Sequence, residues 1–228
     1  MDFRNRNVVV TGGTGALGQA VVGALLAAGA QCRVPWLREA EVTSFPHQDR
    51  VTLVGPCDLT DEDDVARLYR DAGPLWASIH IAGGFAMGNL ADTGKDGLMA
   101  MLDTNLVSCH LCCRAAVQAF ADGGRIVNVG ARPGLEPRLG AGMSAYAASK
   151  AGVIALTQAL AAELASRDIL VNAVVPSIID TPANRASMPK ADHGSWPKPA
   201  QIAATIVFLA SPGNQVTTGA VMPVAGRT

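Results

Sequence analysis

The sequence predicts an α/β fold with one doubly wound parallel sheet and helices on both faces. Short β-branched runs alternate with Ala- and Leu-rich stretches of helical length, and this alternation is typical of parallel strands joined by helical crossovers. The run Asn7–Thr11 has three consecutive valines before a glycine-rich turn, as expected for a strand buried on both faces. No linker or repeat divides the 228 residues, so we expect a single domain, 1–228.

The remaining elements follow from local composition. We expect a helix over Gln19–Ala28, ended by Gly29 in the C′ position, and a helix over Asp61–Asp71, capped by Thr60. Further strands are expected at Cys32–Trp36, Val51–Gly55, Ala77–Ile81, Arg125–Gly130, Ile169–Val175 and Ala220–Val224, and further helices at Leu98–Phe120, Ser144–Ser166 and Ala200–Leu209. Residues 178–199 hold four prolines and little periodicity, which favours a substrate lid.

Composition excludes several classes of protein. A content of 49% hydrophobic and 16% charged residues excludes a disordered chain. A net charge of −1 without a Lys/Arg run, together with 4% aromatic residues, argues against nucleic-acid and membrane partners. We expect no signal peptide, and five cysteines in a chain with a large core favour reduced thiols in the cytoplasm. Cys109 and Cys112 have a C-x-x-C spacing but no second ligand pair, so we interpret them as core residues and expect no metal site.

A glycine-rich turn separates the first strand from the first helix. Glycines there let the backbone approach a pyrophosphate, whose charge then lies at the helix N-terminus. The alternative is a purely structural turn, but the position between strand and helix favours Rossmann-type dinucleotide binding. The residues expected to bind the cofactor in this turn are Gly12, Thr14, Gly15, Ala16, Leu17 and Gly18.

The adenosine end of the expected site is less conventional. NAD-selective sites place an acid at the end of the second strand, where this chain has Trp36. Arg33 and Arg38 can instead contact a 2′-phosphate, or they are ordinary solvated arginines, so the cofactor is NADP or NAD with NADP favoured. Asp58 either binds the adenine amino group or caps the following helix.

Tyr146 and Lys150 are spaced i, i+4 and share one face of a predicted helix. A free tyrosine has a pKa near 10, and lowering it by about three units requires about 4 kcal/mol of preferential phenolate stabilisation. The Lys150 ammonium and the positive ring of an oxidised nicotinamide are suitable sources of that charge. The alternative is a solvated Tyr–Lys pair on the helix surface. The position of the pair after the predicted strand Arg125–Gly130 of a dinucleotide fold favours catalysis.

Together these motifs resemble the short-chain dehydrogenase/reductase family over nearly the whole chain. The motifs in family order are the Gly12–Gly18 turn, Asp58, Ala82-Gly83-Gly84, Asn105-Leu106, RIVNV, Tyr146-x-x-x-Lys150 and Pro176. The resemblance implies that Tyr146 donates the proton, that Lys150 binds the nicotinamide ribose, and that Asn105 holds a water in the proton relay. It also implies cofactor contacts by Leu59, Ala82, Gly83, Pro176, Ile179 and Thr181, the last two at the carboxamide.

Four positions depart from the family pattern. Ala16 replaces a glycine, His80-Ile81 replaces Asn-Asn, and Ser177 follows Pro176 in place of glycine. Gly130-Ala131 stands where the family has the serine that polarises the substrate carbonyl. Either Ser144 substitutes for that serine or the substrate does not need the contact.

In two respects the chain resembles the dihydropteridine reductase-like branch of the family. That branch also lacks the serine, and its sequence is similar to this chain from Asp180 to Trp196. The sequence therefore predicts an NAD(P)H-dependent oxidoreductase for a small carbonyl or quinonoid substrate. The alternatives are a carbonyl or 3-oxoacyl thioester reductase and a non-catalytic NAD(P)-binding sensor. By resemblance we also expect a homodimer or homotetramer formed through the helices Leu98–Phe120 and Ser144–Ser166.

Overall fold

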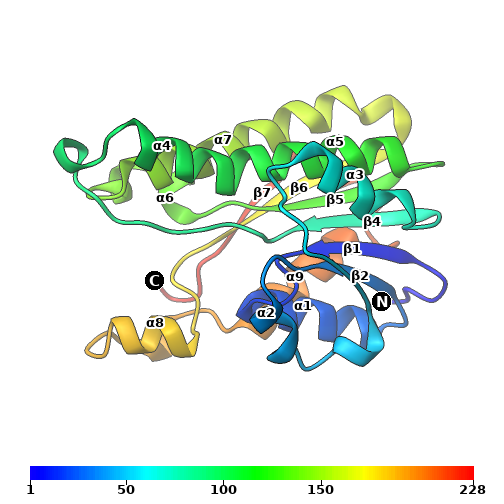
Figure 1. Cartoon of the computed structure of the whole chain (residues 1–228), viewed down its shortest axis with the longest axis horizontal. Coiled ribbons are helices and arrows are strands. Elements are labelled where there is room, and N and C mark those ends of the chain that lie inside the picture. The colour runs from blue at the N-terminus through cyan, green and yellow to red at the C-terminus, as the bar shows by residue number, and fades with distance from the viewer.

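The computed structural model describes all 228 residues and contains one seven-stranded sheet in the order β3-β2-β1-β4-β5-β6-β7 (Figure 1). Every strand pairing is parallel. The strands are β1 (Asn7–Thr11), β2 (Gln31–Pro35), β3 (Thr52–Val54), β4 (Leu75–His80), β5 (Gly124–Val129), β6 (Ile169–Pro176) and β7 (Val221–Val224). The strand order reverses between β1 and β4, which opens a crevice at their carboxyl ends. The predicted fold class is confirmed.

Helices cover both faces of the sheet. Figure 1 shows α1 (Ala16–Ala27) and α9 (Pro199–Ala210) on one face, and α3 (Glu62–Arg70), α5 (Ser108–Ala119) and α7 (Ser144–Glu163) on the other. The shorter helices are α2 (Glu39–Thr43), α4 (Lys95–Leu102), α6 (Arg132–Leu135) and α8 (Pro182–Ser187). No helix combines the length and the apolar character that are needed to cross a bilayer.

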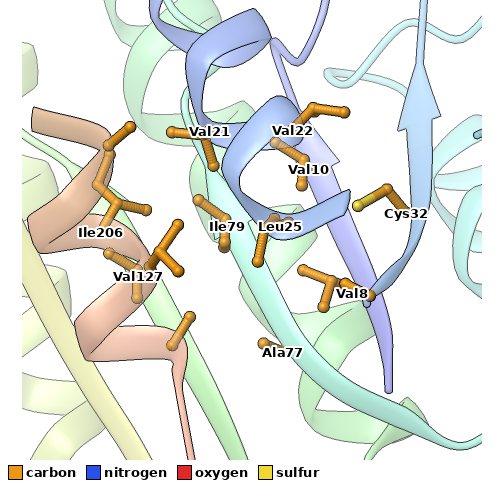
Figure 2. Close-up of a cluster of buried hydrophobic side chains, with 14 of the residues drawn as sticks. Val8, Val10, Val21, Val22, Leu25, Cys32, Ala77, Ile79, Val127 and Ile206 are labelled. Carbon is orange, nitrogen blue, oxygen red and sulfur yellow. The ribbon is translucent and has the colours of Figure 1, made fainter. Parts of the chain in front are cut away.

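The two faces of the sheet each have a hydrophobic core. Val8 and Val10 pack with α1 and α9, whereas Val9 belongs to the core under α3, α5 and α7. Figure 2 shows the first of these cores, where Ile206 of α9 and Leu25 of α1 lie over the sheet. Because side chains alternate along a strand, burial of all three valines confirms that β1 is covered on both sides.

The predicted long helix from Leu98 to Phe120 is interrupted. It consists of α4, a π-helical turn over Asp103–Val107, and α5. Single π turns occur mostly at functional sites. Asn105 lies on this turn, at the local break that the family resemblance implies.

Two local predictions are wrong. Thr60 does not cap α3, because its hydroxyl donates to Asp58 Oδ1 over 2.7 Å. The cap is Asp61, whose carboxylate accepts from the backbone N–H groups of Asp63 and Asp64. Because Asp61 is the cap, Asp58 does not have the helix-capping role that was the alternative to adenine binding.

The predicted irregular segment 178–199 contains α8 and a 3₁₀ turn at His193–Ser195. Trp196 is buried, and the backbone N–H of Asp180 donates to the carbonyl of Pro197 over 2.9 Å. The segment is therefore packed at its base and carries its own helix.

Candidate active site

A cleft of about 840 Å³ lies at the carboxyl ends of the strands, where the strand order reverses. Most of the predicted cofactor residues line it. The predicted residues in the lining are Gly12, Thr14, Gly15, Ala16, Leu17, Gly18, Arg38, Asp58, Leu59, Ala82, Gly83, Ile179 and Thr181. The structure thus brings together, in one cleft, residues that the sequence spreads over most of the chain.

The glycine turn is held against the loop after β4. Gly12 has a φ of +66°, and a Cβ there would lie 2.6 Å from the backbone nitrogen of Ala82. A Cβ on Gly18 would overlap the carbonyl oxygen of Gly12. Ala16 is the exposed first residue of α1, so its methyl group is accommodated. The bare backbone at the start of α1 leaves N–H groups free to face an anion.

The adenosine end of the cleft is lined by Trp36, Arg38 and Glu41. Glu41 of α2 turns back toward the glycine turn, because its Oε2 accepts from Thr14 Oγ1 and from the backbone N–H of Leu37, both over 3.4 Å. Its Oε1 accepts from Arg38 Nε over 3.1 Å. An acid and a base are therefore paired where the ribose of a dinucleotide would lie.

Arg33 does not line the cleft, so of its two alternatives the structure does not favour contact with a 2′-phosphate. Its guanidinium donates to the carbonyl of Leu68 over 2.7 Å and to the carbonyl of Asp71 over 3.3 Å, at the end of α3. Asp58 does line the cleft. Hydrogen bonds from the backbone and the hydroxyl of Thr60 lower the pKa of its carboxyl group, so it is an anion at neutral pH.

Tyr146 and Lys150 lie on the first two turns of α7. Lys150 Nζ donates to the carbonyl of Val129 over 2.9 Å, and a Cβ on Gly83 would lie 3.1 Å from this nitrogen. The Tyr146 ring meets the exposed Phe85 edge to face, with centroids 5.0 Å apart. Neither residue is among those that line the cleft, but Lys150 Nζ lies next to Gly83, which does line it.

Burial acts on both ionisable groups. It raises the pKa of Tyr146 to about 12 and lowers the pKa of Lys150 to about 8, in each case because the charged form loses hydration. Tyr146 is therefore a neutral phenol at neutral pH, which is the form that donates a proton. The lowering of its pKa that the sequence predicts in the presence of an oxidised nicotinamide stays a prediction.

Asn105 joins the loop after β4 to α7. Its Oδ1 accepts from the N–H of Gly84 over 2.9 Å, and its Nδ2 donates to the carbonyl of Gly84 and to Ser149 Oγ, both over 3.1 Å. A Cβ on Gly83 would lie 2.5 Å from Asn105 Oδ1. The side chain thus holds Gly84 against Ser149 of α7, and the water relay stays a prediction.

The segment 178–199, which follows β6, also contributes to the cleft. Ile179, Thr181 and Asn184 line it. Thr181 also caps α8, since its Oγ1 accepts from the N–H of Asn184 over 3.2 Å. Pro176 ends β6, is buried and is not among the residues that line the cleft, so its predicted cofactor contact stays a prediction.

No hydroxyl replaces the missing family serine. Gly130 and Ala131 follow β5 directly and are buried. Ser144 is exposed at the start of α7 and lines a separate hollow beside Leu90 and Lys95. Of the two alternatives, the structure does not favour substitution by Ser144.

Several cleft residues were not predicted from the sequence. They are Pro35, Leu37, Ala40, Glu41, Ser44, Cys57, Thr60, Ile81, Thr104, Ser108, Val129 and Asn184. Glu41 matters most for cofactor selectivity, because it brings a carboxylate to the cleft although the end of β2 has Trp36 in place of an acid. Its helix α2 spans only Glu39–Thr43, which is too short to give a periodic signal.

The chain is similar in sequence to known reductases. The family profile described as Enoyl-(Acyl carrier protein) reductase matches residues 13–226. Carbonyl reductase family member 4 of Danio rerio is 30% identical, over 97% of each chain. The 3-oxoacyl-(acyl-carrier-protein) reductase MabA of Mycobacterium bovis is 30% identical, over 98% of this chain and 93% of the relative.

The fold is also that of solved structures. A short chain dehydrogenase from Burkholderia cenocepacia J2315, solved in complex with NADP, is 28% identical, over 99% of this chain and 98% of the other, with a TM-score of 0.85. The profile match spans most of the chain, and the relatives share its full length. The chain therefore belongs to the short-chain dehydrogenase/reductase family of oxidoreductases.

Proposed function

We propose that the chain catalyses NAD(P)H-dependent reduction of a small carbonyl or quinonoid substrate, with Tyr146 as the proton donor. The observation that carries the proposal is the placement of Lys150 Nζ beside Gly83 of the cleft lining, with Tyr146 one turn earlier on the same helix. The cleft suits a dinucleotide, because its lining includes the glycine turn, whose bare backbone at the start of α1 lets a pyrophosphate approach. NAD(P)H, when bound, supplies the hydride.

In this proposal the protein residues handle the proton. Tyr146 is held neutral by burial and donates its phenolic proton to the substrate atom on which negative charge develops. Lys150, on the same helix face, stabilises the resulting phenolate and binds the nicotinamide ribose. Asn105 keeps Gly83 and Gly84 in place against α7. A non-catalytic sensor would not need Tyr146, Lys150 and Asn105 together, so their joint presence argues against that alternative.

Replacing Tyr146 with phenylalanine tests the proton donor. We expect Tyr146→Phe to lower kcat by about two to four orders of magnitude, which is the usual contribution of general acid catalysis. Its Kd for NADPH, measured by fluorescence titration, should stay within about twofold of the wild-type value. Tyr69, the only other tyrosine, provides a matched control because Tyr69→Phe changes no cleft residue. Unchanged turnover in Tyr146→Phe would refute the proposed mechanism.

We further propose that NADP is preferred over NAD, with Arg38 contacting the 2′-phosphate. The Arg38 side chain is 81% exposed and is tied only to Glu41, so it is free to reorient toward an anion. Glu41 opposes this preference, because its carboxylate can accept from ribose hydroxyls. The Arg38–Glu41 pair is thus the selectivity element.

The two side chains can be separated by mutation. We expect Arg38→Ala to weaken NADPH binding by about 10- to 100-fold, as for loss of a hydrogen bond to a charged group, and to leave NADH binding unchanged. Calorimetry with each nucleotide measures this. If Arg38→Ala has no effect and Glu41→Gln selectively weakens NADH binding, the preference is for NAD.

For the substrate, we propose a conjugated acceptor of the quinonoid dihydropterin class. The support is the absence of a hydroxyl at Gly130-Ala131 and the exposure of Ser144 outside the cleft, since a conjugated ring accepts hydride without a polarising hydroxyl. The second candidate is a 3-oxoacyl thioester or a simple ketone, which the names of the relatives favour.

A substrate panel distinguishes the two candidates. With saturating NADPH, we expect kcat/KM for quinonoid dihydropterin to exceed that for a 3-oxoacyl thioester by at least tenfold. Introducing the family hydroxyl as Ala131→Ser should raise thioester turnover more than pterin turnover. The reverse order in the wild type would select the thioester. Nucleotide binding without turnover of any carbonyl, quinone or pterin would support the sensor alternative.

We also propose that copies of the chain associate through α4, α5 and α7. Leu98 and Met99 of α4 are each 39% exposed, and the alanines at 155, 159 and 162 form an exposed small-residue stripe on α7. All five cysteines are free and buried, which fits the cytoplasmic location that the sequence predicts.

A further inference from the structure

A compact group of buried polar side chains lies directly beneath the cleft. His80 is the last residue of β4, Asn128 lies on β5, and Cys109 and Cys113 lie one turn apart on α5. All four are at most 5% exposed. The proposed reduction uses none of them. His80 is also one of the positions at which this chain departs from the family pattern.

The donor atoms of these four residues converge. Asn128 Oδ1 lies 2.8 Å from His80 Nδ1, 3.4 Å from Cys109 Sγ and 3.6 Å from Cys113 Sγ. His80 Nδ1 lies 3.4 Å from Cys113 Sγ, and the histidine nitrogen and both sulfur atoms lie within 4.8 Å of one another. The four atoms therefore occupy the corners of a small, irregular tetrahedron.

This is the geometry of a thiophilic metal site. Zinc binds thiolate sulfur at about 2.3 Å and imidazole nitrogen or an oxygen at about 2.0 to 2.2 Å, so the donors around one tetrahedral ion are about 3.3 to 3.8 Å apart. We propose that His80, Cys109 and Cys113 bind a divalent ion of the zinc class, with Asn128 Oδ1 as the fourth donor. Binding requires only small shifts of side chains that already face one another.

The surrounding hydrogen bonds orient the donors. His80 Nε2 lies 2.8 Å from Ser78 Oγ, which lies 2.7 Å from the hydroxyl of Tyr69. Without the ion, His80 Nδ1–H donates to Asn128 Oδ1, because an amide oxygen only accepts. Metal binding moves this proton to Nε2, where Ser78 Oγ accepts it, and so frees the lone pair of Nδ1 for the ion. Asn128 Nδ2 donates to Thr157 Oγ1 over 2.9 Å, and this bond directs Oδ1 to the same point.

Charge also balances at this position. On binding, each of the two thiols loses one proton to solvent, so two thiolates neutralise the two positive charges of the ion. A neutral complex avoids the large cost of an uncompensated buried charge. The C-x-x-C pair noted in the sequence is not the ligand pair, because Cys112 lies outside the group and Cys113 takes its place.

The site adjoins the catalytic residues through the backbone. Cys109 lies one helical turn beyond Asn105, and Asn128 precedes Val129, whose carbonyl accepts from Lys150 Nζ. An ion held here would clamp β4, β5 and α5 together beneath the cleft. Metal content is measured by elemental analysis and does not depend on turnover, so the site can be tested whether or not the proposed reduction occurs.

The test uses the whole protein produced in minimal medium with added cobalt or zinc, so that the buried site loads during folding. We expect about one metal ion per chain by elemental analysis. The cobalt form should show thiolate-to-cobalt charge-transfer absorption in the near ultraviolet and ligand-field bands typical of a tetrahedral ion. Absence of both the stoichiometric metal and the bands in the wild type would overturn the proposal.

Variants assign the ligands. Cys113→Ser and His80→Asn should each lower the metal content at least tenfold and abolish or shift the cobalt bands, and asparagine at 80 is the residue of the family pattern. Cys112→Ala is the matched control, since it removes a buried thiol from the same helix but outside the group, and it should retain the ion. Retention by both His80→Asn and Cys113→Ser, or loss only in Cys112→Ala, would contradict the assignment.

Discussion

The close approach of bare backbone at the carboxyl ends of β1 and β4 is the constraint on which the site depends. Gly12 abuts Ala82, and Gly83 abuts Asn105 and Lys150, with no room for side chains at any of these contacts. The strand order reverses at this place, so the two loops diverge to opposite faces and leave a cleft between them. The fold thus produces a groove with exposed N–H groups at one end and a tyrosine–lysine pair near the other.

The same burial that forms the cleft sets the protonation states of its ionisable groups. Desolvation keeps Tyr146 protonated and lowers the pKa of Lys150 to about 8. At neutral pH Lys150 is therefore still mostly an ammonium group. A protonated Tyr146 is the form that the proposed reduction needs. Lys150 donates to the carbonyl of Val129 at the end of β5, and Asn128 of the buried polar group is the preceding residue.

Sequence periodicity predicted every strand of the sheet, because buried β-branched runs carry a strong pattern, but it joined α4 and α5 into one helix across the π turn. It did not predict α2, α6 or α8, which are too short to show a period. The glycine turn and the Tyr146–Lys150 pair were predictable because local spacing fixes them. Glu41, the true position of Arg33 and the convergence of His80 on Cys113 were not, since each depends on how distant segments pack in three dimensions.

The central claim is that the Gly83 end of this cleft binds nicotinamide against Lys150. A fluorescence titration of NADPH into the wild type and into Gly83→Val, with circular dichroism to verify folding, tests it most directly. We expect one saturable site per wild-type chain and at least tenfold weaker binding by the variant, because a side chain at position 83 collides with Asn105 and Lys150. Absence of saturable binding of both NADPH and NADH by the wild type, or equal affinity of a folded Gly83→Val, would contradict it.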